Sequence, residues 1–242
     1  MMRASQRVEL VRGYLLHQRP WRDSSLIIEV FSADFGRLTT FARAARGLRT
    51  RFSGLQPFRP LLLSWSGRGE APSLTGAEGD GAPPAAMASA NLLSAWYLNE
   101  LLLKLTVPHD PQPELYAQYA AALERMRAGV ALETVLRHFE LRLLELLGFG
   151  MELRRECAGG RAVRHDAYYH FTAGEGVRES AGSGISGRLL MMLADGELPS
   201  DPEDQRAART LLRAALDHCL EGRELRTRTV ARAVARMERV SG

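Results

Sequence analysis

The first third of the chain alternates short apolar runs with turn residues. The runs occupy residues 8–18, 25–32, 36–44, 57–67 and 71–78, and the breaks between them are rich in Gly, Pro, Asp and Ser. Alternation with a period of two is typical of strands that bury one face. Five short strands in this stretch predict a small barrel of the OB type.

The pattern changes after a Gly/Pro/Ala segment at residues 79–86, which marks a predicted domain boundary. Beyond it the apolar positions recur with a helical period, and helices are expected over residues 87–107, 113–127, 130–147, 186–193, 202–220 and 227–240. We therefore predict an α+β fold, with a five-stranded OB-fold nucleic-acid-binding domain over residues 1–80 and a mostly α-helical domain over residues 81–242. Residues 150–185 lose periodicity, and an aromatic run at residues 168–171 indicates a small hairpin.

The charge of the chain is informative through its distribution. The formal net charge is only +4, but no acidic residue lies between Asp34 and Glu70. A solvated face is usually mixed in sign, so an acid-free basic segment favours contact with phosphates. Aromatic rings in the same segment can stack on unpaired bases, although rings in a small barrel also serve as core. The predicted DNA-binding residues are Arg37, Arg43, Arg46, Arg49, Arg51 and Phe52, with Phe41 and Phe58 open to either role.

A second group of arginines closes the chain, in the segment RTRTVARAVARM. One interpretation is a recognition helix in a duplex major groove, which would make the protein a sequence-specific DNA-binding regulator. The alternative is that the valines and alanines pack on the preceding helices and the arginines add phosphate contacts. We favour the second interpretation.

The sequence carries none of the common catalytic motifs. A P-loop needs Gly-Lys before Ser or Thr, whereas the single lysine, Lys104, follows Leu103. Cys157, His165 and His170 lack a fourth metal ligand at a defined spacing, so a metal-dependent hydrolase is a weak alternative. The string GSGISG at residues 182–187 matches a dinucleotide fingerprint, but no buried strand precedes it, and Ser186 is better explained as a helix N-cap. We therefore do not expect the protein to be an enzyme.

The order of motifs resembles the RecO family. The match begins with GYLLHQRPWRDSSLIIEVFSADFGRLTTFARAARGLRTRFSGLQPFRPLLLSWSGRGE, resumes in AWYLNELLLKL and LRHFELRLLELLGFG, and continues through CAGG to ISGRLLMML. The resemblance implies a recombination mediator that binds single- and double-stranded DNA and anneals strands without a nucleotide. It also implies two protein partners, RecR and the C-terminal tail of single-strand-binding protein, and a cytoplasmic, nucleoid-associated location.

The chain departs from many members of that family at a zinc finger. Where the family pattern begins C-x-x-C, Cys157 is followed by Ala158, Gly159 and Gly160, and the later pair of cysteines is absent. A tetrahedral structural site cannot be completed from these residues. We expect a degenerate zinc-finger-like region over residues 150–185, held by packing alone and without metal.

The resemblance also implies a partner site on the helix at residues 130–147. An acidic tail that ends in phenylalanine requires an apolar pocket for the ring and a guanidinium for the terminal carboxylate. The candidates are Arg137, Leu141 and Arg142, with Arg137 as first choice. The solvated side of an amphipathic helix is an equally good interpretation of these arginines.

Overall fold

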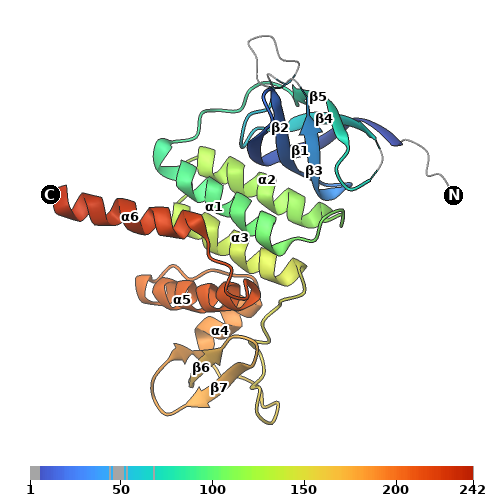
Figure 1. Cartoon of the computed structure of the whole chain (residues 1–242). Helices are drawn as coiled ribbons and strands as arrows, with labels where there is room; N and C mark the ends of the chain where they lie inside the picture. Colours follow the sequence, from blue (N-terminus) through green and yellow to red (C-terminus); the bar gives the residue numbers. More distant parts are fainter. Residues whose placement is uncertain (1–5, 44, 46–51, 53, 68, 242) are drawn as a thin grey trace. The chain divides into compact units, whose positions relative to one another are not determined.

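The computed structural model describes residues 6–43, 45, 52, 54–67 and 69–241 (Figure 1). The five expected strands form a closed barrel in the order β1-β2-β3-β5-β4, which confirms the OB-type fold. All neighbouring strands are antiparallel except β3 and β5. The strands are β1 (Gln6–Trp21), β2 (Ser25–Ser32), β3 (Gly36–Ala42), β4 (Leu61–Gly67) and β5 (Ser73–Gly79).

β1 is long enough to pair with two neighbours. Its first part pairs with β4 and its second part with β2, with shifts in register between Val8 and Val11 and between Leu15 and His17. Such irregularities bend a strand and increase its twist. These bends allow β1 to pair with β4 along its first part and with β2 along its second part.

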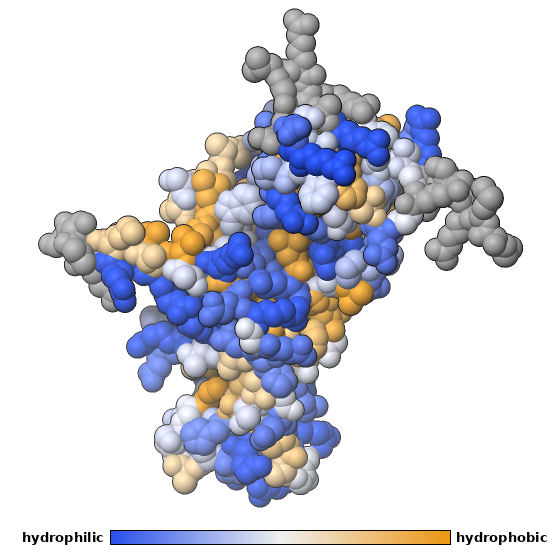
Figure 2. All heavy atoms as spheres, in the orientation of Figure 1, coloured by the Kyte–Doolittle hydropathy of each residue, from blue (hydrophilic) through white to orange (hydrophobic). Residues whose placement is uncertain are grey.

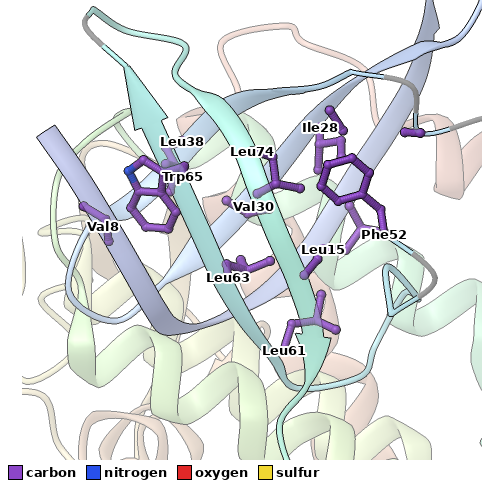
Figure 3. Packing of buried hydrophobic residues seen from close by; sticks show 13 residues of the cluster. Val8, Leu15, Ile28, Val30, Leu38, Phe52, Leu61, Leu63, Trp65 and Leu74 are labelled. Atoms are coloured by element: carbon purple, nitrogen blue, oxygen red, sulfur yellow. The ribbon is translucent and has the colours of Figure 1, made fainter. Parts of the chain in front are cut away.

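The barrel interior is filled by branched aliphatic side chains and a few rings (Figure 3). Leu15, Ile28, Val30, Leu61 and Leu63 are fully buried. Strand β3 shows the alternation clearly, because Leu38, Thr40 and Ala42 point inward while the intervening residues are partly exposed.

The chain divides into two compact units, residues 1–123 with 225–242, and residues 124–224. The boundary predicted after residue 80 lies elsewhere, between the barrel and the helices. That residues 1–80 and 81–242 are separate domains stays a prediction. In the first unit the barrel is joined by α1 (Ser89–Leu105), most of α2 (Pro113–Arg127) and α6 (Arg226–Ser241).

A buried asparagine fastens the barrel to the first two helices. Asn99 on α1 donates from Nδ2 to the Leu16 carbonyl on β1 at 2.9 Å, and its Oδ1 accepts from the Tyr119 hydroxyl on α2 at 2.5 Å. The rings of Tyr14, Phe31, Tyr116 and Tyr119 pack together around this point. This side of the barrel is therefore covered.

The second unit contains α3 (Leu132–Leu146), α4 (Gly187–Ala194), α5 (Pro202–Cys219) and a three-stranded sheet. The sheet consists of β6 (Tyr168–Thr172), β7 (Gly176–Ser180) and β8 (Ile185–Ser186), so the expected hairpin is present. Ser186 accepts from the Leu189 N–H as the N-cap of α4, as expected. In the part of the chain described here, no helix is long and apolar enough to cross a membrane.

Candidate nucleic-acid and partner-binding sites

Of the arginines expected to bind DNA, Arg46, Arg49 and Arg51 lie outside the described residues. Arg43 is exposed just beyond the end of β3. Arg37 is already engaged, since its guanidinium contacts the Glu29 carboxylate at 3.3 Å and the Thr106 carbonyl at 3.0 Å. Its charge is therefore largely compensated within the protein.

The proposed stacking role of Phe52 needs correction. The Phe52 side chain is only 3% exposed and belongs to the barrel core, near Ile28 and Leu15 in Figure 3. A ring at this depth cannot lie against a base unless the core opens. Phe58 is buried as well and contacts the Trp96 ring, with centroids 4.9 Å apart.

Sequence reasoning named Phe41 but missed Trp21, its neighbour on the outside of the barrel. Trp21, the last residue of β1, is 42% exposed, and its ring centroid is 6.3 Å from that of Phe41 on β3. Strand register explains the pairing, because Arg19, Ile27 and Phe41 are aligned across β1, β2 and β3. We call Arg19, Trp21, Arg22, Phe41 and Arg43 the aromatic-basic face.

The loops around this face match the ligand side of an OB-fold, which uses strands β2 and β3 with the β1–β2 and β4–β5 loops. Arg22 begins the β1–β2 turn with a positive φ of 54°. On the other side, the Phe41 N–H donates to the Pro72 carbonyl in the β4–β5 loop at 3.0 Å. Arg19, Arg22 and Arg43 are all exposed.

Signals for this face were present in the sequence. Phe41 has the same parity on its strand as Arg37 and Thr39, which is the parity of the outward side. Trp21 falls in the break predicted between the runs at residues 8–18 and 25–32, so it was not expected on a strand. Rings and cations combined on one exposed surface can stack bases and bind phosphates.

In the second unit, a pocket of about 250 Å³ lies beside α3. Its apolar lining comes from Leu141, Leu144, Met151, Leu153 and Leu193, and its polar edge from Arg142, Glu145 and Asp195. The pocket thus combines apolar walls with a cation, which is the arrangement expected for an aromatic side chain with a nearby carboxylate.

The three residues proposed for the partner tail do not share this pocket. Leu141 and Arg142 line it, whereas Arg137 lies beside another, smaller depression with Leu198 and Gln205. The Arg137 guanidinium is 2.7 Å from Glu140, a carboxylate that is almost completely buried. Arg137 therefore compensates a buried charge, and Arg142 becomes the first candidate.

Arg142 is partly buried and has one acidic neighbour. Its guanidinium is ion-paired with Glu145 on the following turn of α3, and its side chain is 28% exposed. Partial burial, together with Arg125 and Arg142, lowers the pKa of the nearby His138 imidazole. The neutral form of His138 is thereby favoured, so this histidine adds little positive charge beside Arg142 at neutral pH.

The region expected to be zinc-finger-like, residues 150–185, is held by a carboxylate rather than by packing alone. Glu156 is 5% exposed, and its oxygens accept from Arg161 Nε at 3.0 Å and from the Glu179 N–H at 3.2 Å. Cys157 is exposed, and its N–H donates to the Val177 carbonyl. Within the described residues no group of His, Cys, Asp and Glu is arranged to hold a metal ion.

The C-terminal helix also differs from expectation. Its valines were expected to pack on the preceding helices, yet Val230 and Val234 are 48% and 44% exposed. The helix is attached to α1 through its first turn, where Glu100 accepts from the N–H groups of Arg226 and Thr227. Beyond Arg228, every residue up to Met237 is exposed.

Comparison with known proteins gives one consistent result. Residues 7–79 match the family described as Recombination protein O N terminal, and residues 89–229 match Recombination protein O C terminal. The chain is 44% identical over 248 residues to DNA repair protein RecO of Alkalilimnicola ehrlichii, covering 98% of this chain and 96% of that one. It is 41% identical over 230 residues to DNA repair protein RecO of Methylococcus capsulatus, covering 94% of each chain.

Proposed function

The chain belongs to the RecO family, and from that premise we propose that it is a non-enzymatic recombination mediator in DNA repair. In this proposal it binds single- and double-stranded DNA, anneals complementary strands and helps recombinase replace single-strand-binding protein. RecR is its expected second protein partner. Membership of the family supports the repair role, and the finer steps rest on the sites described above.

The observation that carries the proposal is the aromatic-basic face. Trp21, which is 42% exposed, and the partly buried Phe41 present two adjacent rings on the side where an OB-fold binds its ligand. Base stacking on Trp21 and Phe41 would be tolerant of sequence, because every base has a π face. Arg19, Arg22 and Arg43 would contact the phosphates between stacked bases.

The pocket beside α3 supplies the second step. The terminal ring of the acidic tail of single-strand-binding protein would enter between Leu141 and Leu193, and its carboxylate would exchange for Glu145 on the Arg142 guanidinium. This tether raises the local concentration of the aromatic-basic face near coated single strands, so weak stacking suffices to hold exposed bases. A complementary strand or the recombinase then gains access.

The test is fluorescence-anisotropy binding of mixed-sequence single strands across a salt series, without nucleotide or metal. Trp21→Ala should weaken binding by roughly 5- to 150-fold, since stacking contributes about 1–3 kcal/mol per base. Arg19→Ala/Arg22→Ala/Arg43→Ala should reduce the slope of log affinity against log salt by about 2, at about 0.7 for each lost phosphate contact.

The matched control removes the same charge elsewhere, through Arg206→Ala/Arg209→Ala/Arg213→Ala on exposed positions of α5. This variant should change the salt slope by much less. Equal losses in the two triple variants, together with a silent Trp21→Ala, would show that only net charge matters and would remove the face from the proposal.

A further inference from the structure

Two arginines, each held by one acidic side chain, border the pocket beside α3. Arg142 Nη1 contacts Glu145. Arg154 Nη2 contacts Asp195 and, at 3.4 Å, the Ala194 carbonyl. Glu145, Ala194 and Asp195 all line the pocket. Arg154 is thereby held at the edge of the same pocket as Arg142, although it comes from the segment that follows α3 and not from the helix itself.

The Arg154 guanidinium retains donors for a ligand. A guanidinium presents several N–H groups in a planar fork, and Arg154 gives only Nη2 to the protein. Among the residues that the structure describes, Nε and Nη1 of Arg154 have no hydrogen-bond partner. The side chain is 53% exposed, so a carboxylate from solvent can accept a charge-assisted bond from it without displacing Asp195.

Apolar walls distinguish Arg142 and Arg154 from the other arginines on the surface. Figure 2 shows hydrophilic residues over much of the visible surface, so an exposed arginine is not by itself a site. The apolar side of this pocket is lined by Leu141, Leu144, Met151, Leu153 and Leu193. A ligand whose ring lies on these walls has one cation beside it on α3 and a second at the end of α4.

We propose that Arg154 is a second carboxylate subsite of this pocket, which binds an acidic side chain of a peptide whose C-terminal aromatic ring fills the apolar part. Arg142 takes the terminal carboxylate, and Arg154 takes an acidic side chain a few residues earlier in the peptide. Asp195 keeps the Arg154 guanidinium at the pocket edge. The inference rests on the proposed function of the pocket and deepens it, because it gives a reason for the tail to be acidic before its last residue.

The test is fluorescence-anisotropy binding of labelled peptides to the full chain. The Asp peptide ends in phenylalanine preceded by aspartates, the Asn peptide carries asparagine in place of each aspartate, and the amide peptide is the Asp peptide with an amidated C-terminus. The wild type should bind the Asp peptide most tightly. Arg154→Ala should weaken the Asp peptide by roughly 3- to 10-fold and the Asn peptide by much less, because only the Asp peptide offers a side-chain carboxylate.

Two further variants serve as comparisons. Arg142→Ala should remove most of the difference between the Asp peptide and the amide peptide, since it isolates the terminal carboxylate. Arg188 is the matched control, because it also pairs with one aspartate, Asp204, is 46% exposed and does not line this pocket. Arg188→Ala should bind all three peptides nearly as the wild type does. An exposed ion pair contributes little to stability, so Arg154→Ala should fold normally, which circular dichroism verifies.

Several outcomes would overturn the second subsite. One is that Arg154→Ala weakens the Asp and Asn peptides equally, or weakens neither. If Arg142→Ala still removed the effect of amidation, the proposed function of the pocket would stand without Arg154. Equal losses in Arg154→Ala and Arg188→Ala would leave net charge as the cause. Displacement of the Asp peptide by a bare single strand would assign these arginines to a nucleic-acid backbone. A wild type that binds none of the three peptides would remove both the subsite and the proposed function of the pocket.

Discussion

At the scale of single residues, the same residue type occurs both on the surface and in the core of the barrel. Phe41 and Phe52 both belong to the acid-free segment, yet one lies beside Trp21 on the outside and the other fills the barrel. Arg37 and Arg43 differ in the same way, since Glu29 neutralises the first and the second is exposed. Composition locates a basic aromatic segment, but only side-chain direction separates its surface from its core.

Glu156 is the residue on which we expect the region around Cys157 to depend. Glu156→Ala removes the acceptor of the partly buried Glu179 N–H and the partner of Arg161, which is itself largely exposed. Leaving this partly buried donor unsatisfied should cost about 1 kcal/mol, the lower end of the range for a lost acceptor. Amide exchange measured over residues 155–180 should accelerate, whereas the exposed turn variant Glu175→Ala should exchange as the wild type does.

The contacts of Glu156 also predict the response to a chelator. EDTA should leave the thermal midpoint of the wild type unchanged, because Glu156 and the backbone bonds to Val177 hold the segment without zinc. A drop of several degrees on chelation, restored by added zinc, would contradict this account.

At the scale of elements, the sequence was a good guide. Each expected strand and helix is present because alternation and helical periodicity directly record which side of an element is buried. The extent to which a helix is covered was not predictable. The valines of α6 have helical spacing whether they meet a neighbour within the chain or lie exposed, so the expectation of internal packing was wrong.

The start of α6 is fixed by a carboxylate from another helix, which gives it a pH dependence. Partial burial alone would raise the pKa of Glu100, but hydrogen bonds from Thr227 and Arg226 and the charge of Lys104 outweigh it and lower that pKa. A carboxyl with a lowered folded pKa stabilises the native state above its ordinary value near 4.5, and this contribution is lost as the pH falls through the folded value.

Glu100→Gln should therefore reduce the free energy of unfolding by about 1 kcal/mol at neutral pH, comparable to the loss of an N-cap. The difference between wild type and variant should shrink toward zero in acid. Urea titrations at pH values on both sides of the Glu100 transition measure it. A difference that stays constant with pH would mean that the charge on Glu100 is irrelevant to the helix start.

The joint between the barrel and its helices depends on a second buried polar contact. Tyr119→Phe removes the hydroxyl that donates to Asn99 Oδ1 and leaves that buried oxygen without its donor. The expected cost is about 1–3 kcal/mol in urea unfolding. Tyr168→Phe, at a position that is 44% exposed, is the matched control and should be nearly neutral.

At the scale of the whole molecule, the charge distribution was informative but incomplete. The acid-free segment predicts a basic region, yet the ring pair beside it comes from residues far apart in the sequence, which only strand pairing brings together. The pocket beside α3 likewise needs residues from α3, from residues 150–153 and from the end of α4. Such sets cannot be read from spacing along one helix.

The pocket beside α3 leads to a prediction about hand-over. Arg142→Glu should weaken binding of an acidic peptide ending in phenylalanine by roughly 10-fold or more, because the terminal carboxylate would meet a like charge. Its affinity for bare single strands should change little. Arg206→Glu on α5 is the control for net charge. Loss of bare-strand binding in Arg142→Glu would contradict the separation of the two sites.

The short β3–β5 junction makes local opening of the barrel easier at that point. The β3–β5 junction that closes the cylinder consists of one residue pair, Phe41 with Ser73, and the Phe41 N–H bond to Pro72. A seam this short should open more readily than the long antiparallel ladders elsewhere. Because the partly exposed Phe41 ring also belongs to the aromatic-basic face, a base stacked on it would hold the β3–β5 junction closed. Deuterium uptake at the Phe41 amide would then report whether DNA is bound to the barrel.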